Sequence, residues 1–97
     1  MTKTISFDDE ELILEKASYA YDDSLAVVAK TIDGESYAVL TVNLDFPALG
    51  NNEQFFDINL YKGLELLDLL IAEGVLEKTG FEQQSGFVKY PLVRWNL

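Results

Sequence analysis

Two neighbouring stretches, residues 25–32 and 37–44, are rich in apolar and β-branched side chains, as half-buried β-strands are. Between them stands Asp33-Gly34, a pair that readily supplies the positive φ of a type I′ turn. The pattern therefore predicts a β-hairpin across Asp33-Gly34. In its second strand, the residues predicted to share one face are Ala38, Leu40, Val42 and Leu44.

A third stretch, residues 61–73, has the period of a helix rather than that of a strand. Apolar residues recur three and four positions apart: Leu60, Leu64, Leu67 and Ile71 share one face, and Leu66, Leu69 and Leu70 widen it. Asp57 or Asn59 is suited to cap the start, and Gly74 to close the end. This is the one main helix that the sequence predicts.

The other elements are less sharply marked. Residues 12–21 read as a strand, with a helix over the first part as the alternative; the strand would place Ile13, Ala17, Tyr19 and Tyr21 on one face. Residues 55–58, 75–81 and 87–90 are short strand candidates, and Pro91 confines the last one to a sheet edge or a bulge. Residues 1–11 are expected to form a loosely ordered arm, and 45–54 a loop.

Together these elements predict an α+β fold: a four- or five-stranded antiparallel sheet with one main helix packed on one face, within a single domain, residues 1–97. The residues expected to be buried together are Leu40, Val42, Leu64, Leu67, Ile71 and Val88.

The composition removes several kinds of chemistry. The chain has no cysteine and no histidine, which excludes disulfides, thiol nucleophiles and the commonest general base and metal ligand. Asp33-Gly34-Glu35 lacks the ligand spacing of an EF-hand and is better explained as a turn. We therefore expect no enzyme, no cofactor and no metal site.

The formal net charge of −10, from 17 acidic and 7 basic residues, bears on the partners. It disfavours direct binding to nucleic acid or to an anionic membrane, and favours a protein partner with a basic surface. Residues 1–49 hold ten of the acids and only three lysines. The candidate acidic interaction surface consists of Asp8, Asp9, Glu10, Glu11, Asp22 and Asp23.

The same acids suggest an alternative, a DNA mimic that inhibits a nuclease of restriction or CRISPR type. Such a mimic needs its carboxylates gathered on one face, whereas a generic interaction module, including one that forms a homodimer, can spread them. A second candidate region is aromatic and basic, and consists of Phe87, Lys89, Tyr90, Arg94 and Trp95. Stacking on nucleic acid is one interpretation of it; core packing with an internal salt bridge is the simpler one.

The first residues, Met1 to Asp9, lack the apolar segment of a signal peptide, and no apolar run approaches the ~20 residues that span a bilayer. These features favour the cytoplasm.

Four short segments resemble a known family. They are Thr41-Val42-Asn43-Leu44, Phe56-Asp57-Ile58-Asn59, Lys78-Thr79-Gly80 and Ser85-Gly86-Phe87-Val88-Lys89-Tyr90-Pro91-Leu92. They are similar to domain of unknown function 4313, a family of small uncharacterised bacterial proteins that often sit on conjugative elements and plasmids. The resemblance covers about residues 37–92, with Ile58 where we expect a threonine. It implies no activity. It implies a bacterial accessory protein of a mobile genetic element, which agrees with a non-enzymatic interaction module.

Overall fold

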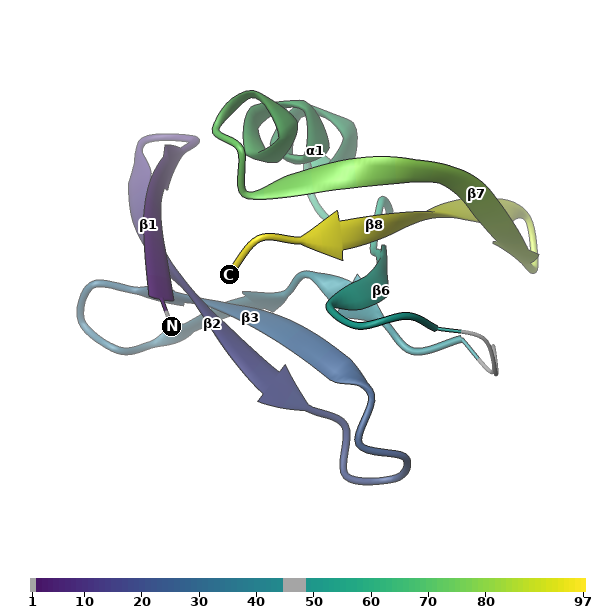
Figure 1. Ribbon diagram of the computed structural model, residues 1–97. Coiled ribbons are helices and arrows are strands. Elements are labelled where there is room, and N and C mark those ends of the chain that lie inside the picture. Colours follow the sequence, from purple (N-terminus) through teal and green to yellow (C-terminus); the bar gives the residue numbers. More distant parts are fainter. Residues whose placement is uncertain (1, 45–48) are drawn as a thin grey trace.

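The computed structural model describes residues 2–44 and 49–97, and these form eight strands and one helix (Figure 1). In chain order the elements are β1 (Thr2–Phe7), β2 (Glu10–Ser18), β3 (Leu25–Thr31), β4 (Ser36–Val39), β5 (Thr41–Val42), β6 (Glu53–Phe56), α1 (Gly63–Ala72), β7 (Leu76–Ser85) and β8 (Val88–Trp95).

The strands form two antiparallel sheets of four, ordered β1-β2-β3-β4 and β5-β6-β8-β7. The α+β class is confirmed, although the strands are divided between two sheets. The division occurs at Leu40, within the single strand predicted over 37–44. There the Leu40 N–H donates to the Val27 carbonyl, while the Leu40 carbonyl accepts from the Asp57 N–H. The chain thus leaves the first sheet and joins the second at one buried residue.

The predicted hairpin is confirmed, because β3 and β4 pair in register Val28↔Val39. Its turn is wider than the two-residue turn expected. The Thr31 N–H bonds to the Glu35 carbonyl, and of the turn residues only Gly34 has a positive φ, 85°. This is the three-residue loop that ends in a left-handed residue.

The first eleven residues are not a loose arm, and that prediction was wrong. β1 pairs with β2 along its whole length, from Thr2↔Glu15 to Phe7↔Glu10, and Ile5 and Phe7 are buried. The two strands are joined by Asp8 and Asp9, both with positive φ, which is the backbone of a type I′ turn. Aspartate tolerates this conformation better than most residues do, so Asp-Asp closes the hairpin.

The core lies between the sheets, and its buried members are Ile5, Phe7, Leu12, Leu14, Val27, Ala29, Leu40, Phe56, Leu66, Leu67, Leu70, Val75, Leu76, Val93 and Trp95. The strand interpretation was right for residues 12–18, where β2 ends, and the face predicted to hold Ile13 and Ala17 is not the buried one. Leu12 and Leu14 point inward, whereas Ile13 is only half-buried and Tyr21 is 96% exposed. The alternation of side chains along a strand does not show which of its two faces is buried. In β2, which pairs with β1 and β3, the buried face is the one that holds Leu12 and Leu14.

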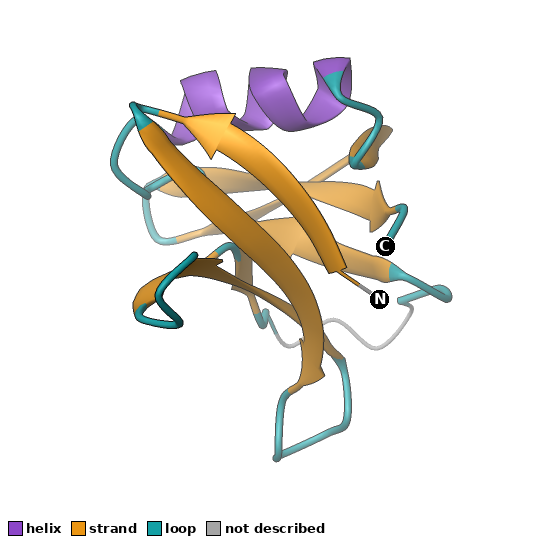
Figure 2. Cartoon of the chain, turned by 90° about the vertical axis from the view of Figure 1, so that its left-hand side faces the viewer, coloured by secondary structure: helices purple, strands orange, loops and turns teal. Residues whose placement is uncertain are grey.

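Helix α1 lies at one end of the molecule, between the β1–β2 turn and β7 (Figures 1 and 2). The helix was predicted correctly, but part of its inner face was not. Leu66, Leu67 and Leu70 are buried, whereas Leu64 is 65% exposed and Ile71 38%. Apolar residues occur on so many sides of this helix that their spacing is compatible with more than one buried face.

The two ends of α1 differ in how well the sequence anticipated them. Gly74, with φ 73°, closes the helix as predicted. The start has no side-chain cap: Lys62 holds that position in a left-handed conformation, and Asp57 instead accepts a hydrogen bond from the Asn59 N–H.

Of the other predicted core residues, Val42 and Val88 are only half-buried.

Candidate functional site

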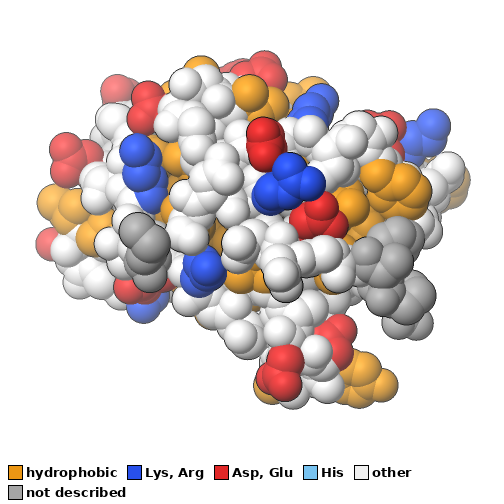
Figure 3. Space-filling model, viewed as in Figure 1, with side chains coloured by type: hydrophobic (Ala, Val, Ile, Leu, Met, Phe, Trp, Pro, Cys, Tyr) orange, Lys and Arg blue, Asp and Glu red, His pale blue; other side chains and the backbone are white. Residues whose placement is uncertain are grey.

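The six acidic candidates lie in two groups at opposite ends of β2. Asp8–Glu11 form the β1–β2 turn and the first residues of β2, while Asp22 and Asp23 lie in the β2–β3 connection. A nine-residue strand separates the groups by about 30 Å. Lys3, Lys16 and Lys30 lie on β1, β2 and β3 between them. Figure 3 accordingly shows Asp and Glu side chains scattered over the visible face, with basic side chains interspersed.

Each acidic group has its own local structure. Asp8 accepts a hydrogen bond from the Lys62 Nζ at 2.8 Å, which ties the β1–β2 turn to the start of α1 and raises the pKa of Lys62. Burial raises the pKa of Tyr37 nearby, and the charges of Asp8 and Glu10 raise it further. Asp22 accepts hydrogen bonds from the Ser24 side chain and N–H and from the Asn43 amide, which lower its pKa.

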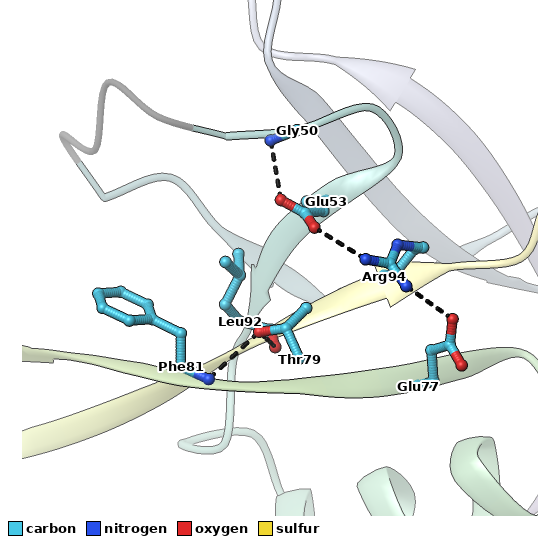
Figure 4. Close-up of polar contacts among 7 residues, drawn as sticks. All are labelled: Gly50, Glu53, Glu77, Thr79, Phe81, Leu92 and Arg94. Carbon is cyan, nitrogen blue, oxygen red and sulfur yellow. Dashed lines mark hydrogen bonds and ion pairs between the residues drawn. The ribbon is translucent and has the colours of Figure 1, made fainter.

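The aromatic and basic candidates divide into an inner and an outer part. Trp95 is 1% exposed, stacks near Phe56 at 6.3 Å between ring centroids, and belongs to the core. Arg94 lies on the opposite face of β8 and bonds to Glu77 at 2.9 Å and to Glu53 at 3.3 Å (Figure 4). Both carboxylates, Glu77 foremost, raise the pKa of Arg94. These two residues therefore have structural roles, as the simpler interpretation predicts.

The other three candidates lie in the distal part of the β7–β8 hairpin, residues 82–91, which extends beyond β6 because β6 pairs with β8 only from Leu92 to Arg94. Phe87 and Lys89 are exposed there, and Phe87 is completely so. Tyr90 is half-buried, and its hydroxyl accepts a hydrogen bond from the Asn59 side chain at 3.1 Å. The hairpin is thus held at its base and free at its tip.

A β-bulge marks the base of this hairpin, and it was foreseen only through Pro91. The register moves from Lys78↔Val93 to Glu82↔Pro91, so three residues of β7 face one of β8. Gly80 has a φ of 92°. The Thr79 hydroxyl donates to the Leu92 carbonyl at 2.9 Å and accepts from the Phe81 N–H at 3.2 Å (Figure 4). The Thr-Gly pair is the signal in the sequence that marks the irregularity.

Two hollows were not predicted from the sequence, although Asp22 and Asp23 of the candidate acidic surface line one of them. One, of about 620 Å³, lies between the β2–β3 connection and residues 49–53. Lys16 on its wall already donates to the Asn52 side chain and the Leu97 carbonyl, so its charge is engaged within the protein. The other, of about 310 Å³, is apolar and lies beside Tyr37 and Tyr61. Within residues 2–44 and 49–97, no group of three or more metal-binding side chains comes together.

Comparison with known proteins gives one match. The model of the family described as domain of unknown function (DUF4313) matches residues 13–97. The chain belongs to this family. No curated protein and no solved structure matches it.

The segments that resemble the family lie in the second sheet and in the connection from β6 to α1. Lys78-Thr79-Gly80 enters the β-bulge, and residues 85–92 form the turn and most of β8. The Asn59–Tyr90 hydrogen bond connects two of these segments directly.

The part of the chain that the structure describes contains no helix with the length and hydrophobicity of a membrane span.

Proposed function

We propose that this protein is a non-enzymatic protein-interaction module that contacts its partner through the distal β7–β8 hairpin. The observation that carries the proposal is the complete exposure of Phe87 at the tip of that hairpin. Exposed aromatic side chains of this kind are the usual anchors of protein–protein interfaces, where they fill a pocket on the partner.

The fold does not explain Phe87. Ser85 pairs with Val88, so the turn between them has two residues, Gly86 and Phe87. Gly86, at φ 63°, supplies the positive φ that such a turn requires at its first position. The second position has no comparable requirement, and a polar residue there would serve the turn equally well. The phenylalanine is therefore better explained by a contact outside the chain.

The charge near the tip also favours a protein contact. Residues 82–97 contain a single acid, Glu82, together with Lys89 and Arg94, although the whole chain has a net charge of −10. The hairpin is thus a nearly neutral, aromatic projection from an acidic protein. The total charge still opposes direct binding to nucleic acid and to anionic membranes.

The proposal extends to the cellular setting. The resemblance to DUF4313 supports a role as an accessory protein of a bacterial mobile genetic element, acting in the cytoplasm. The DNA-mimic alternative is not part of the proposal, because lysines separate the two acidic groups.

The test is affinity capture from a bacterial lysate with the full chain and two single variants. Phe87→Ser removes the proposed anchor. Tyr21→Ser is the matched control, since Tyr21 is a second, almost fully exposed aromatic residue at a different turn. We expect the wild type and Tyr21→Ser to retain the same proteins, and Phe87→Ser to lose them. Equal capture by all three would refute the role of the hairpin, provided that circular dichroism shows all three to be folded.

A further inference from the structure

The two sheets have four edge strands, and three of them are poorly suited to pairing with another chain. β4 has four residues and β5 has two. β7 has ten, but its bulge and the positive φ of Gly80 interrupt the regular edge. Short edges and bulges are the ordinary means by which proteins prevent edge-to-edge association.

The fourth edge, β1, is neither short nor bulged, and Lys3 is the one charged side chain on it. Its six residues pair with β2 in an unbroken register, without a bulge, a proline or a glycine. Along an edge strand, every second residue directs its N–H and C=O away from the sheet. Among the described residues, β2 is the only element that pairs with β1, and no turn or loop hydrogen bond reaches Thr2–Phe7. Thr2, Lys3, Thr4 and Ser6 are exposed.

The charge beside this edge indicates what it can receive. β1 ends at the acidic β1–β2 turn, where Asp8 is already paired with Lys62. Asp9, Glu10 and Glu11 are exposed and have no ion pair within residues 2–44 and 49–97. Three uncompensated carboxylates therefore lie at the turn end of the β1–β2 hairpin, Asp9 in the turn and Glu10 and Glu11 on β2.

We propose that the free edge of β1 binds an extended, basic segment of a partner protein by strand addition, with the lysine or arginine side chains of the segment at the end nearest the acidic β1–β2 turn. Main-chain hydrogen bonds supply affinity in this mode, and alternate side chains supply specificity. One face of β1 carries the buried Ile5 and Phe7, and the other carries Thr2, Thr4 and Ser6. The added strand therefore alternates apolar residues with polar or basic ones.

A second copy of the chain is a poorer occupant of the same edge. Two copies, each with a net charge of −10, repel one another, and pairing β1 with β1 brings no cation other than Lys3 from the strand itself. A basic segment meets no such repulsion. This surface is separate from the β7–β8 tip, so the strand-addition proposal stands or falls independently of Phe87.

The test uses a synthetic nonapeptide in which valine alternates with threonine and lysine, added to the full chain labelled with ¹⁵N. We expect the amide shifts of Thr2–Phe7 to change, and hydrogen exchange to slow at every second one of these residues, those whose N–H points away from β2. The same peptide with alternate amides N-methylated keeps its charge but loses donors on one edge, and we expect it not to bind. Equal binding of both peptides would overturn strand addition in favour of plain charge attraction.

Two double variants test the role of the carboxylates. Glu10→Lys with Glu11→Lys is expected to weaken peptide binding about tenfold, chiefly through slower association. Glu35→Lys with Glu73→Lys makes the same change of charge at two exposed sites elsewhere, and is expected to weaken binding much less. Equal losses in the two would contradict a local role of the acidic turn. Sedimentation of the chain with and without the peptide completes the test. A dimer that the peptide abolishes would assign the edge to a second copy of the chain.

Discussion

The β1–β2 and β7–β8 hairpins each provide a long edge strand, but they are built in opposite ways. In β1, Ile5 and Phe7 are buried and the register is unbroken, so the strand is part of the core. In β7, only Leu76 at its start is buried, and the bulge at Gly80 separates it from an exposed distal part. The comparison indicates that the first hairpin stabilises the fold, whereas the tip of the second contributes little to the core.

The largest expected effect concerns two phenylalanines, one in each hairpin. Phe7→Ala is expected to lower the free energy of unfolding by about 3–5 kcal/mol, because it empties a buried site. Phe87→Ala is expected to change it by less than about 0.5 kcal/mol, as exposed positions do. Urea unfolding followed by circular dichroism measures both. A small effect of Phe7→Ala would mean that β1 is a loose arm after all.

A smaller effect is expected from the hydroxyl that organises the bulge. Thr79→Val removes the hydrogen bonds to the Leu92 carbonyl and from the Phe81 N–H, and is expected to cost about 1–2 kcal/mol. Thr79→Ser keeps the hydroxyl and is the control. In the regular β1, Thr4→Val removes no hydrogen bond within the described residues and is expected to be nearly neutral. Equal effects of Thr79→Val and Thr4→Val on the urea midpoint would show that the bulge does not depend on Thr79.

The smallest effect concerns the ion pair that ties the β1–β2 turn to α1. The hydrogen bond and charge of Asp8 raise the pKa of Lys62 above its ordinary 10.5. The stabilisation is therefore complete below pH 10.5 and is lost as the pH rises through the higher folded-state pKa.

Lys62→Met is the variant that tests this pair. We expect it to flatten the fall in urea midpoint between neutral and strongly alkaline pH, relative to the wild type, because it has no ammonium group to lose. Since the pair is exposed, its contribution at neutral pH is small. Parallel midpoint curves for the two proteins would show that Lys62 and Asp8 do not interact in solution.

Several features were predictable because they depend on neighbours along the chain. The β3–β4 hairpin followed from two apolar runs around Asp33-Gly34, and the helix from the spacing of its leucines and Gly74. The bulge near Pro91 followed from the missing N–H of proline. For the aromatic and basic candidates, core packing with an internal salt bridge was right for Trp95 and Arg94 and wrong for Phe87 and Lys89, which are exposed.

Other features escaped the sequence for identifiable reasons. The Asp8-Asp9 turn was missed because Asp-Asp is a weaker turn signal than Asn-Gly or Asp-Gly. The buried face of α1 was misjudged because leucines surround much of the helix. The separation of the acidic groups was implicit in the strand predicted between them, whereas the lysines that lie between the groups on β1 and β3 depend on strand pairing.

The sequence by itself determined the class of fold, the main hairpin, the helix and the absence of cysteine and histidine chemistry, because composition and short-range periodicity are local properties of the chain. Only the tertiary structure decided that the chain crosses between two sheets at Leu40, that Leu12 and Leu14 point inward, and that β1 is a regular open edge. Strand pairing is determined by contacts between residues far apart in sequence. The alternation of apolar and polar residues along one strand does not show which of its faces, or which of its edges, those contacts will cover.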